Sequence, residues 1–201
     1  MIRLLEKWKI NLDQKKFVGA VLMDLSKAFD CVPHDLLLAK LEAFGFDANS
    51  LTFLYSYLKR RKQSVKINNT FSALLILLSG VPQGSILGAI LFNIFINDLI
   101  LFLENSDIIN FADDNTVSAM ANTIPDLLKI LESESDVAIK WFQNNDMIVN
   151  PDKFQAIIVN KHSRLHESYK LKVDPYEIET EGNVELLGIE IDDKLTFAKH
   201  S

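Results

Sequence analysis

Hydrophobic and polar positions along the chain switch between strand-like runs and helix-like spacing. An uninterrupted apolar run over 17–23 predicts a buried strand that ends at Asp24. Shorter runs of the same kind predict further strands around 65–67, 74–78, 156–159, 170–173, 176–178 and 186–191. The strands and helices do not alternate regularly, so the pattern predicts an α+β fold in which helices back an antiparallel sheet.

Four segments have the spacing of amphipathic helices. They cover 35–45, 50–58, 85–103 and 125–145, after a short amphipathic stretch at the start of the chain. Asp35 and Ser50 are the expected N-caps of the first two helices, and Gly45 suits the end of the first. Pro125 is well placed in the first turn of the last helix.

The amino-acid composition is typical of a single globular domain. Its 201 residues are 48% hydrophobic, which is enough for a single domain with a substantial core, and no repeat or linker divides it. The apolar runs are too short to span a membrane, and the charged N-terminus lacks the features of a signal peptide. The single cysteine, Cys31, fits a reducing, intracellular setting. A net charge of −6 argues mildly against a stand-alone nucleic-acid binder.

Adjacent carboxylates interrupt two β-prone runs at 108–118. Asp113 and Asp114 stand where a hairpin would bend, and the flanking apolar residues would hold its arms in a core. Two carboxylates this close repel one another, and a divalent cation such as Mg²⁺ or Mn²⁺ would offset that repulsion. Taken alone, an acidic pair in a surface turn is usually just solvated.

Asp24 is the second acidic feature. An aspartate that closes a buried strand lies at the edge of the sheet, where it would meet the pair in the hairpin and complete a site for two metal ions. The alternative is that Asp24 caps the turn that follows it.

Three segments together resemble the reverse transcriptases of non-LTR (LINE-type) retrotransposons, most closely the jockey-like elements of animals. They are Asp-Leu-Ser-Lys-Ala-Phe-Asp at 24–30, Gly-Val-Pro-Gln-Gly at 80–84 and Phe-Ala-Asp-Asp at 111–114, in the family's order and spacing. The resemblance continues through 141–159, with Asn150 and Lys153, and through 186–189. It therefore covers almost the whole chain.

The resemblance implies the palm of a right-hand polymerase and an RNA-directed DNA polymerase activity. Asp24 and Asp113 would bridge two Mg²⁺ ions, with Mn²⁺ as a substitute, and the backbone carbonyl of Leu25 would join the coordination. Asp114 would be the third acid, with a lesser role. The ions would lie about 3.5–4 Å apart and assist an in-line attack of a primer 3′-hydroxyl on a dNTP.

Other matched positions imply roles around the nucleotide. Phe29 would be a steric gate that excludes a 2′-hydroxyl, and Gln83 and Gly84 would lie along the incoming nucleotide. Lys153 would protonate the departing pyrophosphate. Each position also has a purely structural alternative. Phe29 would be a core side chain, Gln83 and Gly84 would form a turn that leads into a helix, and Lys153 would be a solvated surface lysine.

A basic cluster, Lys59, Arg60, Arg61 and Lys62, is the one place where the charge runs positive. Such a cluster is typical of a solvated helix end, and the resemblance implies instead a contact with nucleic-acid phosphates. The implied partners are an RNA template, a DNA primer and dNTP, with no membrane.

The resemblance also implies a domain organisation. Residues 1–201 would form one reverse transcriptase domain, with a palm core at 17–160 and a strand-rich segment at 161–201. The fingers, the thumb and the endonuclease of the retrotransposon polyprotein are expected to be largely missing from this chain. The expected location is intracellular, in a nuclear or cytoplasmic ribonucleoprotein. Two alternatives stay open: a folded but inert polymerase remnant, and an unrelated Asp-Asp metal phosphohydrolase, which would not explain the segment at 80–84.

Overall fold

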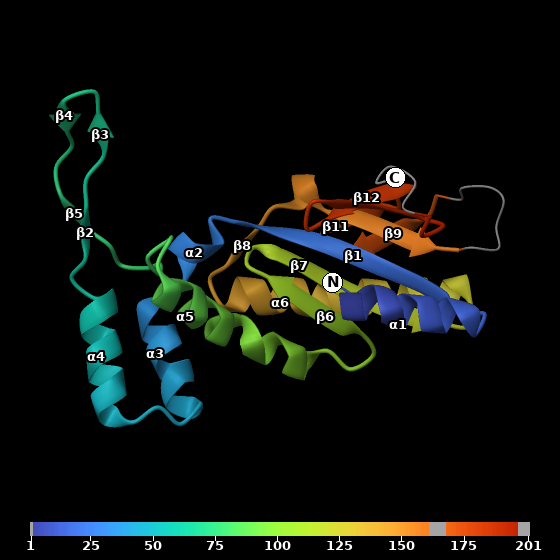
Figure 1. Ribbon diagram of the computed structural model, residues 1–201, viewed down its shortest axis with the longest axis horizontal. Helices are drawn as coiled ribbons and strands as arrows, with labels where there is room; N and C mark the ends of the chain where they lie inside the picture. Colours follow the sequence, from blue (N-terminus) through green and yellow to red (C-terminus); the bar gives the residue numbers. More distant parts are fainter. Residues whose placement is uncertain (1, 161–167, 197–201) are drawn as a thin grey trace. The chain divides into compact units, whose positions relative to one another are not determined.

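The computed structural model describes residues 2–160 and 168–196, whose helices and strands are labelled in Figure 1. The chain divides into two compact units. Unit 1 comprises Met1–Leu25, Leu99–Trp141 and Val149–Ser201, and unit 2 comprises Ser26–Asp98 and Phe142–Ile148. Each unit is described by itself.

An antiparallel sheet forms the centre of unit 1. Its strands follow the order β6 (Asp107–Phe111), β7 (Asp114–Ala121), β1 (Phe17–Ser26) and β8 (Ile148–Val149), and β9 (Gln155–Val159) also pairs with β1. The strand predicted at 17–23 is confirmed, and it continues three residues further. The hairpin predicted around the acidic pair is β6–β7.

Alternate residues of β1 face opposite sides of the sheet. Val18, Ala20 and Leu22 pack on one side against α1 (Ile2–Asp13) and against the hairpin of β12 (Asn183–Leu186) and β13 (Ile189–Asp192). The indole Nε1 of the buried Trp8 donates to Ser118 Oγ at 2.7 Å, which ties α1 to β7. Because Asp24 has the same parity as Leu22, it faces this side as well.

The other side of the sheet packs against α6 (Ile124–Asn144), the helix predicted at 125–145. Gly19 makes this approach close, since a Cβ there would lie 2.7 Å from Leu131 Cδ1 and 3.3 Å from Leu127 Cδ2. Leu127 and Leu131 are themselves fully buried. The small residue therefore lets the helix lie flat on the sheet.

A buried carboxylate joins α6 to the loop before β6. Glu134 is only 5% exposed. It accepts hydrogen bonds from Glu104 N at 3.1 Å, Asn105 N at 3.3 Å and Ser106 Oγ at 2.8 Å. The loop thus gains acceptors for backbone groups that no strand satisfies.

The last part of unit 1 differs from the sequence prediction. The strand predicted at 186–191 is instead the β12–β13 hairpin, which turns at Leu187 and Gly188, both with positive φ. Before it, η2 (Pro151–Lys153) leads into β9. The strands predicted at 170–173 and 176–178 are β10 (Lys170–Val173) and β11 (Tyr176–Glu179), which pair with each other. The part of the predicted segment 161–201 that falls on 161–167 and 197–201 lies outside the described residues.

Unit 2 is mainly helical. Its helices are α2 (Ala28–Cys31), α3 (His34–Ala43), α4 (Ala48–Leu58) and α5 (Ile86–Ile96). Two of the predicted caps are wrong: α3 begins after Pro33 without a side-chain cap, and α4 is capped by Asp47, which accepts from Asn49 N and Ser50 N. Asp47 lies about one turn before Ser50, so the helix begins earlier and the free N–H groups of its first turn bond to the Asp47 side chain.

The predicted helix 85–103 is shorter than expected. Ser85 caps α5 by accepting from Gly88 N, but the α-helix ends at Ile96 and continues as the 3₁₀-helix η1 (Asn97–Phe102). In the described part of the chain, no helix is both long enough and apolar enough to cross a membrane.

A long hairpin connects α4 to α5. It consists of β2 (Lys62–Gln63) paired with β5 (Leu75–Ile76), and β3 (Lys66–Ile67) paired with β4 (Thr70–Phe71). Strand β5 is shorter than the predicted run at 74–78. The hairpin returns at Ser79–Gly80, where Gly80 N donates to Val32 O at 2.8 Å.

Candidate active site

Asp24 and Asp114 stand opposite each other on neighbouring strands. They are paired in the register of β1 with β7, and Leu25 N donates to Asp113 O at 3.3 Å just beyond them. Residues opposite each other in an antiparallel pair have Cβ atoms about 4.5–5.5 Å apart. The structure therefore brings together the three acids that the sequence singled out, all within unit 1.

A tight turn presents Asp113. Phe111 pairs with Asp114, so Ala112 and Asp113 alone form the loop of the hairpin. Ala112 has a φ of 56°, a left-handed conformation that side chains rarely adopt. The buried Asn115 holds the turn, because its Nδ2 donates to Asp113 O at 2.8 Å. Asp113 and Asp114 are exposed, as the sequence predicted.

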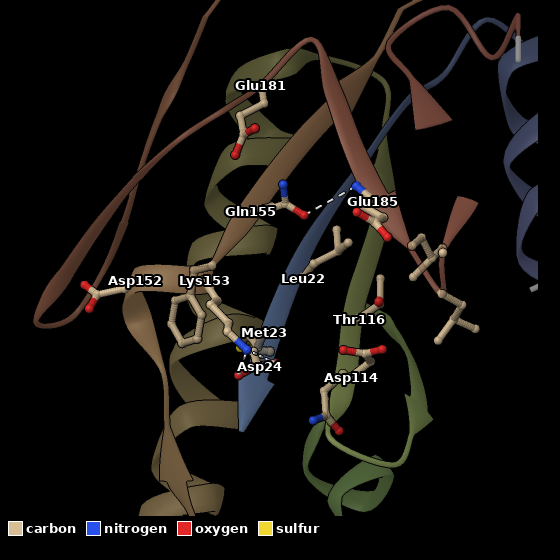
Figure 2. A pocket seen from close by; sticks show the side chains of 15 residues that line it. Leu22, Met23, Asp24, Asp114, Thr116, Asp152, Lys153, Gln155, Glu181 and Glu185 are labelled. Atoms are coloured by element: carbon tan, nitrogen blue, oxygen red, sulfur yellow. Dashed lines mark hydrogen bonds and ion pairs between the residues drawn. The ribbon is translucent and has the colours of Figure 1, made fainter. Parts of the chain in front are cut away.

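Asp24 is held from the opposite edge of β1 by the segment that carries η2. Asn150 N donates to Asp24 O at 2.9 Å, and Asn150 Nδ2 approaches Asp24 Oδ2 at 3.4 Å. Lys153 Nζ lies 3.4 Å from both carboxylate oxygens. Figure 2 shows Lys153 reaching Asp24 while Asp114 lies on the adjacent strand. From the sequence, Asn150 was predicted only as part of a motif, without this position beside Asp24.

The surroundings of Asp114 disfavour its ionised form. Partial burial raises the pKa of Asp114, the negative charges of Asp113 and Asp24 raise it further, and Lys153 opposes them. The raised pKa means that folding makes ionisation of Asp114 less favourable.

Asp114→Asn is therefore expected to stabilise the chain at neutral pH in the presence of a chelator. An aspartate whose pKa is raised by folding contributes stability that is complete below its ordinary pKa and is lost as pH rises through the raised value. Thermal unfolding from pH 3 to 8 should show the variant melting above the wild type at neutral pH, with the difference vanishing in acid. A variant that melts lower at neutral pH would contradict this assignment.

A cavity of about 490 Å³ adjoins these acids (Figure 2). Its lining includes Asp24, Asp114, Lys153, Gln155 and Glu185. Gln155 Oε1 accepts from Glu185 N at 3.4 Å, which links β9 to β12 at the rim. Gln155 and Glu185 were not predicted from the sequence, since nothing in the local pattern places β12 beside the acids.

The donor set suits a hard divalent cation, because aspartate oxygens are the ligands that Mg²⁺ and Mn²⁺ prefer. Burial is the main cause of the raised pKa of Asp114, and the negative charges of Asp113 and Asp24 add a contribution that a cation would offset. Across residues 2–160 and 168–196, however, no three His, Cys, Asp or Glu side chains are arranged to hold an ion. The chemistry of the acids thus fits a metal, although their side chains are not gathered around one point.

The residues predicted to contact the nucleotide belong to unit 2. Phe29 is half-buried and stacks on Phe92, with ring centroids 4.6 Å apart at an interplanar angle of 26°. The exposed Gln83 donates from Nε2 to Asp30 Oδ1 at 3.1 Å. Gly84 has a φ of +75°, and no atom lies within 4 Å of where its Cβ would be. Backbone conformation and not crowding therefore favours glycine at position 84.

Two side chains of the basic cluster bond to other groups of the protein, and two are exposed to solvent. Arg61 is half-buried and donates to the carbonyls of Leu58 and Gly80. Lys59 pairs with Asp35 at 2.7 Å. Arg60 and Lys62 are exposed. The sequence has no acidic residue between Asp47 and Asp98, so these cations lie in a stretch of uniformly positive charge.

A scan against protein-family models matches residues 2–191 to "Reverse transcriptase (RNA-dependent DNA polymerase)". Among curated proteins, the chain is 27% identical over 195 residues to a probable RNA-directed DNA polymerase from transposon BS of Drosophila melanogaster. It is 26% identical over 209 residues to the RNA-directed DNA polymerase from mobile element jockey of the same species. Both alignments cover 94% of this chain and 21% of the relative, so the chain spans about a fifth of the length of these proteins.

Solved structures with a similar fold include two of telomerase from Candida tropicalis. The apo enzyme truncated from the C-terminal domain matches with a TM-score of 0.65 at 15% identity, covering 96% of this chain and 38% of that one. The apo enzyme without that truncation gives a TM-score of 0.66 at 14% identity, covering 96% of this chain and 35% of that one. The mixed helices and antiparallel sheet are therefore a polymerase palm-like α+β fold, which confirms the predicted fold class. Because the family model matches nearly the entire chain, the protein belongs to the reverse transcriptase (RNA-dependent DNA polymerase) family.

Proposed function

We propose that this chain is the polymerase domain of a non-LTR retrotransposon protein, which adds dNTP to a DNA primer on an RNA template. The observation that carries the proposal is the pairing of Asp24 with Asp114 beside the turn at Asp113, in a chain that belongs to the reverse transcriptase family. Residues 1–201 would form one such domain, with its palm core at 17–160. The fingers, thumb and endonuclease would belong to the longer polyprotein, and the enzyme would act inside the cell on its bound RNA.

In this proposal, Asp24 and Asp113 hold two Mg²⁺ ions, with Mn²⁺ as a substitute, and Leu25 O and Asp114 assist. When bound, the ions would favour ionisation of the primer 3′-hydroxyl and neutralise charge on the triphosphate. Asn150 would keep Asp24 in place through its backbone hydrogen bond at 2.9 Å. Lys153, whose ammonium lies beside the acids, would donate a proton to the departing pyrophosphate.

The contacts to the nucleotide are proposed for unit 2. Stacking on Phe92 would hold the Phe29 ring in one orientation, as a steric gate against a 2′-hydroxyl requires. The exposed Gln83 would offer its amide to the nucleotide or the template, in place of its present bond to Asp30. Gly84 would allow the backbone to approach the nucleotide closely.

Phosphate contacts are assigned mainly to Arg60 and Lys62, because Arg61 and Lys59 already have partners on the protein. Replacing both Arg60 and Lys62 by alanine is expected to weaken binding to an RNA–DNA duplex at every sequence. The slope of log K against log salt should fall by roughly two, since each lost phosphate contact removes about one. Titration at several salt concentrations measures this slope.

The matched control replaces Lys129 and Lys140, two exposed lysines of α6, by alanine. It removes the same charge from a surface to which no nucleic-acid contact is assigned. An equal loss of slope in both double variants would show that net charge, and not a local contact, governs binding.

Primer extension tests the proposed function. Wild type and Asp113→Asn would be compared on an RNA template with a DNA primer, dNTP and Mg²⁺, both as this chain and within a longer chain from the same locus. Extension by the wild type and none by Asp113→Asn would support the assignment. If neither this chain nor the longer chain extends the primer with the wild-type sequence, the alternative of an inert remnant is favoured.

A further inference from the structure

Lys153 contacts the same carboxylate to which the proposed function assigns a metal ion. Its Nζ lies 3.4 Å from Oδ1 and 3.4 Å from Oδ2 of Asp24, so one ammonium spans both oxygens. Any divalent cation bound by Asp24 must use these oxygens as well. The two positive groups therefore compete for one site.

The ion pair between Lys153 and Asp24 is weak. Charge-assisted hydrogen bonds between an ammonium and a carboxylate are typically about 2.7–2.9 Å long, so 3.4 Å is a loose approach. The Lys153 side chain is 64% exposed, against 18% for Asp24. A long, exposed lysine can move away into solvent at little cost, whereas Asp24 is fixed by the sheet and by Asn150 N.

The charges nearby favour an internal cation. Asp113, Asp24 and Glu185 all act on Asp114 as negative charges, and Lys153 acts on it as a positive one. Lys153 therefore partly neutralises the negative charge that these acids place around Asp114.

We propose that Lys153 is an internal counterion of Asp24, which competes with divalent cations and is released from the acids when a cation binds. The inference rests on the proposed function, because it assumes that Asp24 is a metal ligand. Binding and release are thermodynamically linked: whatever free energy Lys153 contributes to holding Asp24 is subtracted from the affinity for the cation. The released ammonium is then available to the phosphates of a nucleotide.

Metal affinity gives the first test, with Mn²⁺ as the probe and its free concentration followed by electron paramagnetic resonance. Lys153→Met should bind Mn²⁺ about two- to fivefold more tightly than the wild type, the range for loss of an exposed ion pair. Lys153→Arg keeps the charge and should stay near the wild type. Lys129→Met removes an exposed lysine of α6 and should change nothing. Equal or weaker binding by Lys153→Met would overturn the proposal.

Accessibility of the amine gives the second test. The rate at which an acetylating N-hydroxysuccinimide ester modifies Lys153, followed by peptide mass spectrometry, should rise when Mn²⁺ is added. In Asp24→Asn the rate should already be high and should not respond to Mn²⁺. A Lys153 rate that is indifferent to Mn²⁺ in the wild type would overturn the release step.

Failure of the inference and failure of the proposed function are distinguishable. If Asp24→Asn leaves Mn²⁺ affinity unchanged, Asp24 is not a metal ligand, and the metal assignment falls together with the inference. If Asp24→Asn weakens binding but Lys153→Met does not strengthen it, the metal assignment stands and the counterion role alone is overturned.

Discussion

Replacing Asp24 by asparagine is expected to reduce dNTP incorporation by at least about a thousandfold while leaving the fold intact. Loss of a metal-binding carboxylate costs several kcal/mol of transition-state stabilisation, and about 4 kcal/mol corresponds to a factor of a thousand. The contacts of the Asp24 carboxylate with Asn150 and Lys153 are both long, at 3.4 Å. Their loss should therefore change the free energy of unfolding by less than about 1 kcal/mol.

Single-turnover incorporation and urea unfolding, measured on the same preparation, check both halves of this prediction. Asp152→Asn is the matched control, because Asp152 is an exposed acid that lines the same cavity but lies in η2. It should retain nearly full activity. An Asp24→Asn protein with more than a tenth of wild-type activity would show that the acid is not required.

Glu134→Ala is expected to have the largest effect on stability, with a loss of about 3 kcal/mol in the free energy of unfolding. The carboxylate is buried and accepts from two backbone N–H groups and one hydroxyl in the loop before β6. Truncation would leave these donors without an acceptor inside the protein, and each such group costs about 1–3 kcal/mol unless water reaches it. Urea unfolding followed by circular dichroism measures the loss.

Glu132→Ala serves as the comparison from the same helix. Its carboxylate accepts a single exposed hydrogen bond, from Lys172 N at 2.8 Å, so its removal should cost less than about 1 kcal/mol. Similar losses in the two variants would mean that any acid on α6 matters equally and that the buried hydrogen bonds do not determine the difference.

Local patterns predicted the elements that hold the acids. An apolar run is a reliable sign of a buried strand, and β1 indeed delivers Asp24 to the end of the sheet. The hairpin around Asp113 and Asp114 and the helix α6 were likewise predicted, because strong periodicity and turn-forming residues mark them. The roles assigned to these acids stay predictions.

Features for which neighbouring residues offer competing alternatives were harder to predict from the sequence. Asp47 and Ser50 are both good N-caps one turn apart, and only the backbone path decides that Asp47 is used. The turn of the β12–β13 hairpin places Leu187 at positive φ, a position where leucine is uncommon, so the sequence there looked like one continuous strand. The change from α-helix to 3₁₀-helix after Ile96 has no distinct residue signal.

The meeting of Asp24 with the acidic hairpin was predicted, but most other contacts between distant segments were not. Asn150 and Lys153 reach Asp24 across more than 120 residues of sequence. The acceptors that Glu134 offers to the loop before β6 are another example, because nothing in that loop identifies its partner. Such contacts depend on how whole elements pack, which periodicity along one segment does not describe.

The conformation of Ala112 limits which mutations this hairpin can accumulate. At a φ of 56°, glycine or asparagine would be tolerated easily, alanine at some cost, and valine or isoleucine only with severe strain. A β-branched substitution at position 112 would therefore disturb the turn that presents Asp113 without altering any acid, whereas glycine would preserve the turn and give Asp113 more conformational freedom. Inspection of the three acids alone would not reveal either change.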